Sequence, residues 1–165
     1  TLLSMFNALL RIAQIEAGGR RDNFATVDLA AVLSDVAELY EPVAQEKGLN
    51  FSAHVEAAET VSADRDLLFQ SVANLADNAI KYTPAGGSVT LHATGRSITV
   101  SDTGPGVPKE ARNDVFRRFH RLEESRSAPG SGLGLSLVKA VAQLHGGEVR
   151  LEDNRPGLKA TLTLG

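Results

Sequence analysis

The sequence predicts an α+β domain in which helices pack on one mostly antiparallel or mixed sheet. Two observations support this. Stretches with apolar residues at three- and four-residue steps, typical of helices, alternate with short stretches in which every second residue is apolar, typical of strands. Over the 165 residues these stretches follow the order α, α, ββ, α, ββ, loop, α, ββ. This length and order fit one layered domain with an appendage.

The two N-terminal helices are predicted from their apolar periodicity. Residues 1–19 carry an apolar stripe at helical spacing and end in a double glycine, a typical stop signal. The stripe is too wide to remain in water, so this helix needs a partner; its members are Leu2, Phe6, Leu9, Leu10 and Ala13. A polar linker with one short strand candidate follows at 20–26. The second helix is expected from Leu29 to Glu46, where Gly48 stops it.

The rest of the chain alternates strands with two further helices. Asp64 is the expected N-cap of a helix that ends near Tyr82, and another helix is expected over residues 133–145. Strands are expected at 49–57, 60–63, 88–94, 97–102, 148–153 and 159–164. Residues 104–132 are rich in Gly, Pro, Ser and charge, with a short helical piece at 111–119. A loop of this length inside a compact domain is typical of a functional lid.

Composition excludes several classes of protein. A hydrophobic content of 42% and a charged content of 22% exclude disorder and fibres. The absence of cysteine excludes disulfides, thiolate zinc sites and a cysteine nucleophile. A net charge of -3 and only 5% aromatic residues argue against nucleic acid as a partner. No run approaches the ~20 apolar residues that span a bilayer. We therefore expect a soluble, intracellular domain.

The first candidate site is a polar stripe on the helix after Asp64. Asn74, Asn78, Lys81 and Tyr82 are spaced so that they share one helix face. An asparagine carbonyl is a hard oxygen ligand that suits Mg²⁺, and a lysine can neutralise phosphate oxygens. The same residues are also consistent with a solvated helix face.

Two glycine-rich segments form the second and third candidates. In DTGPGVP (102–108) the glycines allow close approach to the backbone, and Asp102 could accept a hydrogen bond from an exocyclic amine; a plain tight turn is the alternative. In GSGLGLSLVKA (130–140) the glycines lead into a helix N-terminus, which attracts an anion, or they form a simple hinge. No strand precedes this second segment and no GxxxxGK[ST] occurs, which excludes a Rossmann site and a P-loop. Between the two segments Arg117, Arg118 and Arg121 could stabilise charge on a γ-phosphate, or be solvated.

Taken together, four motifs in this order resemble those of a known family. NLADNAIKYTP, DTGPGVP, VFRRFHR and GSGLGLSLVK look like the N box, first glycine box, phenylalanine box and second glycine box of the ATP-binding catalytic domain of bacterial two-component sensor histidine kinases, in the Bergerat-fold (GHKL) ATPase superfamily. LLRIAQIEAGG is similar to the end of their second dimerisation helix. The resemblance implies a two-layer sandwich with a mixed sheet of about five main strands, helices on one face and an added N-terminal helix. It divides the chain into a dimerisation helix (1–19), a linker (20–26) and a catalytic domain (27–165) with a lid at about 108–131.

The resemblance also implies roles for the matching residues. Asn78 matches the Mg²⁺-binding asparagine and Asn74 the upstream asparagine that faces the phosphates, while Asp102 matches the acceptor of the adenine amine. Lys81 matches the phosphate lysine and Arg121 the lid arginine that reaches the γ-phosphate, so Asn74, Lys81 and Arg121 are the expected catalytic residues. The remaining ATP-binding positions by this match are Tyr82, Gly104, Gly106, Val107, Gly130, Gly132, Leu133, Gly134, Leu135 and, in the last strand, Thr161.

Two departures from related proteins are informative. Hydrolytic relatives carry a glutamate four residues before the metal asparagine, where this chain has Asn74, and Asp77 points about 100° away from Asn78 on a helix. Hydrolysis is therefore disfavoured. The histidines are His54, His92, His120 and His145, and none lies in the phosphoacceptor box of the family. His145 ends a helix, where a positive charge would suit the dipole. The chain is thus expected to bind ATP and Mg²⁺ but not to autophosphorylate alone.

The resemblance implies a histidine kinase domain that delivers the ATP γ-phosphate to a histidine, for relay to an aspartate on a response regulator receiver domain. Its expected partners are the dimerisation helices of its own homodimeric kinase. The expected location is the cytoplasmic half of a membrane-anchored sensor. One alternative is a non-catalytic module that responds to nucleotide. Another is a relative that phosphorylates serine on a partner; the N-terminal helix favours the histidine kinase.

Overall fold

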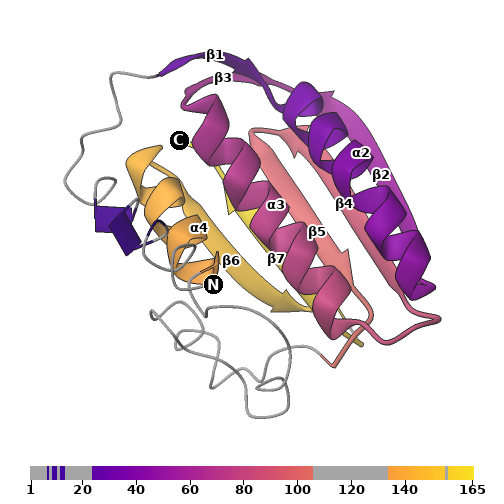
Figure 1. Cartoon of the computed structure of the whole chain (residues 1–165). Coiled ribbons are helices and arrows are strands. Elements are labelled where there is room, and N and C mark those ends of the chain that lie inside the picture. The colour runs from indigo at the N-terminus through magenta and orange to yellow at the C-terminus, as the bar shows by residue number, and fades with distance from the viewer. Residues whose placement is uncertain (1–6, 8, 11, 14–23, 106–133, 155) are drawn as a thin grey trace.

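A computed structural model of the chain describes residues 7, 9–10, 12–13, 24–105, 134–154 and 156–165. Within these residues, helices α2, α3 and α4 lie side by side on one face of a mixed sheet, which we call the main sheet (Figure 1). This two-layer arrangement and the mixed sheet of five strands confirm the predicted fold class. The predicted lid at 108–131, with its helical piece at 111–119, lies outside the described residues.

The main sheet has the strand order β2-β4-β5-β7-β6. Its strands are β2 (Asn50–Ala58), β4 (Ser88–Gly95), β5 (Ser97–Asp102), β7 (Leu158–Thr163) and β6 (Glu148–Asp153). β2 pairs with β4 in parallel, and the other three pairs are antiparallel. β4 and β5 form the hairpin predicted across Gly95-Arg96. Because β5 is the central strand, its last residue, Asp102, lies in the middle of one end of the sheet.

A second, two-stranded sheet pairs β1 (Ala25–Asp28) with β3 (Thr60–Ala63) in antiparallel fashion. The strands on either side of the expected 57–59 turn therefore belong to different sheets, and Ala57 at this junction has a φ of 52°. β1 starts at Ala25, in the segment where the sequence indicated one short strand candidate. Ala25 and Thr26 thus form part of a strand.

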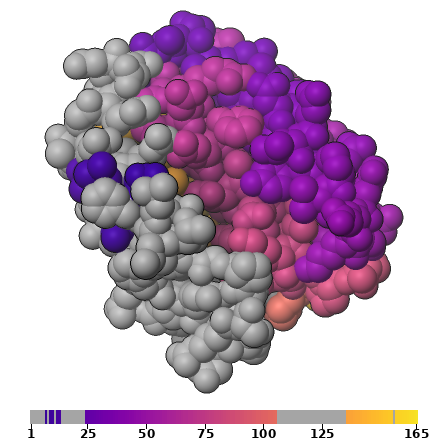
Figure 2. All heavy atoms as spheres, in the orientation of Figure 1, coloured from indigo at the N-terminus to yellow at the C-terminus, as the bar shows by residue number. Residues whose placement is uncertain are grey.

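The helices begin and end where local chemistry dictates. α2 (Leu29–Lys47) is capped by Asp28 and ends at Gly48, which adopts the left-handed conformation with φ 83°. α3 (Arg65–Tyr82) has the predicted cap: Asp64 Oδ1 accepts the Leu67 N–H at 3.2 Å. α4 spans Gly134–Leu144. The side chains of α2 and α3 form a continuous surface on this side of the molecule (Figure 2). Within the described ranges, no helix combines the length and the apolar character needed to cross a bilayer.

The N-terminal residues that are described are helical and pack with a different face than predicted. Ile12, which was not assigned to the apolar stripe, is only 2% exposed and belongs to the hydrophobic core. Leu9 packs partly against that core, whereas Leu10 is 48% exposed and Ala13 is exposed. The stripe is therefore rotated so that Leu9 and Ile12, three residues apart, face the domain. Leu2 and Phe6 lie outside the described residues.

Ser71 offers a test of packing inside the helix layer. Its side chain on α3 is fully buried, and among the described residues its hydroxyl has no hydrogen-bond partner. A buried polar group without a partner destabilises the fold, and alanine also favours helix more than serine does. Ser71→Ala should therefore raise the free energy of unfolding by about 1 kcal/mol in urea titrations.

The matched control is Ser52→Ala, because the Ser52 hydroxyl shares a hydrogen bond with Thr90 at 3.3 Å. That variant should be no more stable than the wild type. A loss of stability in Ser71→Ala would mean that the hydroxyl makes a bond after all.

Candidate functional site

A narrow cavity of about 50 Å³ lies at the end of β5, between α3, α4 and β7; we call it the strand-end pocket. It is lined by Leu75, Asn78, Ala79, Tyr82, Val100, Asp102, Leu135, Leu158 and Ala160. The structure thus brings together four residues singled out from the sequence: Asn78 and Tyr82 from α3, Asp102 from β5 and Leu135 from α4. The other five are apolar and were not predicted. The pocket therefore has apolar walls with a few polar groups, the usual character of a small-molecule site.

Asp102 is held rigidly at the end of β5. Its side chain is 7% exposed, and Oδ1 accepts the Gly104 N–H at 2.9 Å and the Leu158 N–H at 3.2 Å. Its own carbonyl accepts from Asn154 Nδ2 at 2.7 Å. Burial raises the pKa of Asp102 above the ordinary aspartate value, and the two backbone hydrogen bonds lower it only in part. Both of these side-chain bonds use Oδ1, so the carboxyl group has a fixed orientation in the pocket wall.

Two glycines permit this arrangement. A Cβ on Gly104 would lie 2.6 Å from the Tyr82 carbonyl oxygen, so only glycine lets the chain after β5 pass the end of α3. Gly157 has a φ of 109°, and a Cβ there would lie 1.8 Å from the carbonyl oxygen of Asp102. The sequence predicted Gly104 as a site residue but not Gly157. Asn154 and Gly157, in the turn between β6 and β7, are therefore supports of the site that sequence reasoning missed.

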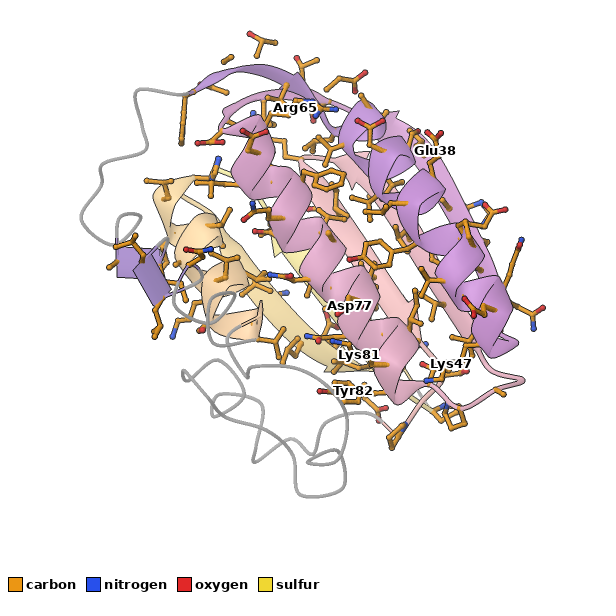
Figure 3. All side chains as sticks on the ribbon, in the orientation of Figure 1. Glu38, Lys47, Arg65, Asp77, Lys81 and Tyr82 are labelled. Atoms are coloured by element: carbon orange, nitrogen blue, oxygen red, sulfur yellow. The ribbon has the colours of Figure 1, made fainter. Side chains whose placement is uncertain are left out.

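The polar face of α3 carries a charge pair that was not predicted, although its i,i+4 spacing on the helix is the signal that could have revealed it. Lys81 Nζ lies 2.8 Å from Asp77 Oδ2, one helical turn earlier, and both side chains are about one-third exposed or less (Figure 3). Asp77 also raises the pKa of the half-buried Tyr40 of α2, secondary to the effect of burial itself. Asn74 lies one turn before Asn78 and is partly exposed. The expected phosphate lysine therefore has a carboxylate partner in this structure.

A lysine from α2 fixes the end of α3. Lys47 Nζ donates to the carbonyl oxygens of Ile80 at 2.6 Å and Lys81 at 2.8 Å, and Figure 3 shows it beside the end of that helix. The last carbonyls of a helix have no partner within the helix, so a cation there is favourable. Lys47 thus holds the backbone that carries Lys81 and Tyr82. No local sequence pattern could reveal this contact, because Lys47 and Lys81 are 34 residues apart.

The structure does not bring Thr161 to the pocket. Alternate residues of a strand face opposite sides, and in β7 the pocket residues are Leu158 and Ala160. Thr161 lies on the other face of the main sheet, where its hydroxyl is 3.3 Å from that of Thr99. Gly134 is the first residue of α4. The other candidates, Gly106, Val107, Arg121, Gly130, Gly132 and Leu133, lie outside the described residues.

His145 differs from its expected role as a positive charge at a helix end. It lies just after α4 and is 7% exposed, and its Nε2 accepts the backbone N–H of Asp64 at 3.1 Å. A nitrogen that accepts cannot also carry a proton, so the ring is neutral here. His54 and His92 lie opposite each other on β2 and β4, and His92 Nε2 is 3.5 Å from Glu56 Oε2. His120 lies outside the described residues.

The described residues fit Mg²⁺ only together with a phosphate ligand. Among them, no group of three or more His, Asp or Glu side chains could hold a metal ion. Asn78 offers one amide oxygen at the pocket wall. Mg²⁺ in nucleotide sites keeps several waters and takes one or two protein ligands together with phosphate oxygens. The donor set is therefore suitable for a metal that arrives with a phosphate chain.

The fold matches that of sensor histidine kinases of known structure. The structure of the mycobacterial sensor histidine kinase MprB superposes with a TM-score of 0.72 and 32% identity, covering 86% of this chain and 96% of that one. The structure of full-length ShkA in complex with AMPPNP superposes with a TM-score of 0.79 and 32% identity, covering 99% of this chain and 36% of that one. The chain is therefore of the class of ATP-binding catalytic domains.

The sequence comparisons identify the family. The sequence pattern of the family described as histidine kinase-, DNA gyrase B-, and HSP90-like ATPase matches residues 63–165. The chain belongs to this family. It is also 37% identical over 176 residues to hybrid signal transduction histidine kinase D of Dictyostelium discoideum, a match covering 99% of this chain and 11% of that relative. The chain thus spans only a small part of the full-length kinases that it resembles.

Proposed function

We propose that this chain is the catalytic part of a sensor histidine kinase and that it presents the γ-phosphate of ATP to a histidine located elsewhere in the whole protein. The observation that carries this proposal is the position of Asp102, a rigid acceptor in an apolar pocket, at the end of the helix that bears Asn78 and Lys81. A buried acceptor between apolar walls has the chemistry to receive a purine with an exocyclic amine. The phosphate chain would then extend along the polar face of α3.

Each residue has a distinct task in this proposal. The Asp102 carboxyl accepts the adenine amine, and the apolar wall residues enclose the base. Asn78 would hold Mg²⁺ together with the phosphates, and the metal would supply charge neutralisation there. Asn74, Lys81 and Arg121 would position the phosphates and stabilise developing charge, since phosphoryl transfer depends mainly on positioning and electrostatics. A histidine imidazole would attack the γ-phosphorus, forming an N–P bond as the bond from that phosphorus to the β–γ bridging oxygen breaks and ADP leaves.

The described site contains no good base for water. Position 74 carries an amide, which cannot take a proton. Asp77, the nearest carboxylate to Asn78 in the sequence, is paired with Lys81. These two observations support transfer to a protein acceptor over ATP hydrolysis.

The proposed kinase domain also has defined partners. The N-terminal helix would continue into the dimerisation helices of a homodimer, and the phosphate would pass to an aspartate of a response regulator receiver domain. The domain would work in the cytoplasm, where ATP is available. Support comes from the kinase relatives.

The proposal is tested by calorimetric titration with a non-hydrolysable ATP analogue, with and without Mg²⁺, on the chain and on Asn78→Ala. We expect saturable binding that the metal strengthens in the wild type and does not strengthen in Asn78→Ala. With labelled ATP the chain alone should remain unlabelled, and a longer form that contains the acceptor histidine should become labelled. Binding without labelling of the longer form would favour the non-catalytic module, and no binding at millimolar analogue would contradict the proposal.

The Asp77–Lys81 pair leads to a further prediction. Asp77→Asn frees Lys81 for phosphate oxygens, so we expect affinity for the ATP analogue to rise about threefold, the scale of a partly exposed ion pair. Adenosine, which has no phosphates, should bind with unchanged affinity. Asp66→Asn is the matched control, because it removes the same charge from the first turn of α3. Weaker analogue binding in Asp77→Asn would show that Asp77 itself supports the phosphate site.

A further inference from the structure

A contact far from the strand-end pocket joins three separate segments of the chain. The ring of Phe24, immediately before β1, stacks on the imidazole of His145, with centroids 4.7 Å apart and planes inclined by 14°. His145 follows directly after α4 and is buried. Its Nε2 accepts the N–H of Asp64, the N-cap residue of α3. The imidazole thus contacts Phe24 before β1, the start of α3 and the end of α4.

The hydrogen bonds of His145 fix a single state of the ring. Nδ1 lies 2.7 Å from the carbonyl oxygen of Val141, which can only accept, so Nδ1 carries the proton. Nε2 then has a lone pair for the Asp64 N–H at 3.1 Å. With both nitrogens engaged and one face against Phe24, the ring holds a defined position and tautomer.

This contact and the strand-end pocket lie at opposite ends of the same two helices. α3 runs from Asp64, at the contact, to Tyr82, at the pocket. α4 runs the other way, from Leu135 at the pocket to His145 at the contact, so the two helices are antiparallel neighbours (Figure 1). The 11 residues of α4 span about 16 Å. Because packed helices move as rigid bodies, the spacing set at one end affects the spacing at the other.

The third partner of the imidazole belongs to the segment that leads from the N-terminal helix. Phe24 is partly buried against the core, and Ile12, twelve residues before it, is fully buried in the same core. Ile12, from the N-terminal helix, and Phe24, from the expected linker, are therefore both seated on the domain in this structure. Displacing the linker would remove Phe24 from the face of His145.

We propose that His145 is a positioning residue for the nucleotide pocket and that the Phe24 stack makes its position depend on the docking of the linker at Phe24. The linker and the nucleotide are then thermodynamically coupled through the spacing of α3 and α4, and each strengthens binding of the other. This inference rests on the proposed function for its ligand, but the contact itself can be tested without any nucleotide.

Two single variants and their combination separate coupling from ordinary packing. Phe24→Leu keeps an apolar side chain but loses the stack, and His145→Phe keeps an aromatic ring but cannot accept the Asp64 N–H. We expect each to lower affinity for the ATP analogue about fivefold. Because the two residues act in series, the double variant should also lose about fivefold, whereas independent effects would multiply to about 25-fold.

A second readout needs no nucleotide. The exchange rate of the Asp64 amide proton, followed by NMR, reports the bond to His145 directly. Phe24→Leu should accelerate this exchange about tenfold relative to wild type. Phe51→Leu is the matched control, because Phe51 of β2 is also a partly buried phenylalanine packed on the core; it should change neither the exchange rate nor the affinity.

The outcomes are distinguishable from failure of the proposed function. If the wild type binds no analogue, the function fails, while unchanged Asp64 exchange in Phe24→Leu would overturn the coupling. If the wild type binds and the two variants have multiplicative effects, or effects no larger than those of Phe51→Leu, the residues are packing residues only. Should His145→Phe fail to fold, Phe24→Leu still decides the question through affinity and exchange together.

Discussion

Gly157→Ala is expected to lower the free energy of unfolding by about 4 kcal/mol. Gly157 combines a φ of 109°, which a side chain rarely adopts, with a backbone path on which a Cβ would lie 1.8 Å from the Asp102 carbonyl oxygen. The turn cannot move away without releasing the Asn154 bond to that same carbonyl and the Leu158 bond to the carboxyl group. Stability and nucleotide binding should therefore fall together.

Gly86→Ala provides the matched control for backbone strain. Gly86 has a φ of 93°, but a Cβ there would meet nothing within 4 Å. The free energy of unfolding of this variant should fall by only about 1 kcal/mol, because alanine is unfavourable at this φ. It should bind nucleotide normally. Urea unfolding followed by circular dichroism measures the stability of both variants. Circular dichroism is used because the chain has no tryptophan to serve as a fluorescent probe. If the two variants lost the same free energy of unfolding, the close approach of a Cβ at position 157 to the Asp102 carbonyl oxygen would cost no stability.

Asp102→Asn is expected to lower affinity for the ATP analogue about 100-fold, or about 2.7 kcal/mol. The retained oxygen can still accept from Gly104 and Leu158, so the new amide group turns its N–H toward the pocket. A donor then faces the donor amine of adenine. A nucleotide with a 6-oxopurine base presents an acceptor instead, so its affinity should rise relative to that of ATP.

Asp28→Asn serves as the control, because Asp28 caps α2 on the exposed surface. It should leave both affinities unchanged. If Asp102→Asn bound the ATP analogue as tightly as the wild type, Asp102 could not be the acceptor of the base. Calorimetric titration with the two nucleotides measures the switch directly.

Asp102→Asn also tests how the stability of the fold depends on pH. Burial raises the pKa of Asp102 in the folded chain, so the folded state holds the proton more tightly than the unfolded state. Ionisation then destabilises the fold as the pH rises from the unfolded pKa, near 4, through the folded one. Asp102→Asn carries no charge. It should melt at the same or a higher temperature than the wild type at pH 7, and the difference should vanish below about pH 4.

The parts of the fold that the sequence predicted well are those with local causes. The cap of α3 is Asp64 bonding to an amide three residues later, and the hairpin across Gly95-Arg96 joins adjacent strands. The polar face of α3 follows from helical spacing alone, and Asn78 and Tyr82 do reach the pocket. Motif order added Asp102 and Leu135, which lie on other elements.

The parts that were missed depend on contacts between distant segments or on strand orientation. Asn154 and Leu158 reach Asp102 from 52 and 56 residues away, and no sequence spacing encodes such a contact. Thr161 was placed by family likeness alone. The alternation of Leu158, Ala160 and Leu162 would have assigned these residues to the helix-covered face and Thr161 to the other.

The parallel pairing of β2 with β4 has a consequence for the order of folding. Parallel neighbours cannot be joined by a tight turn, and here β3 and α3 make the long crossover between them. The entropy of closing that connection must be overcome before β2 can align, so we expect α3 to be in place first. β2 is also an edge strand, so it should join the sheet late in folding and detach early when the domain unfolds locally. Whatever stabilises α3 therefore also stabilises the outer edge of the sheet.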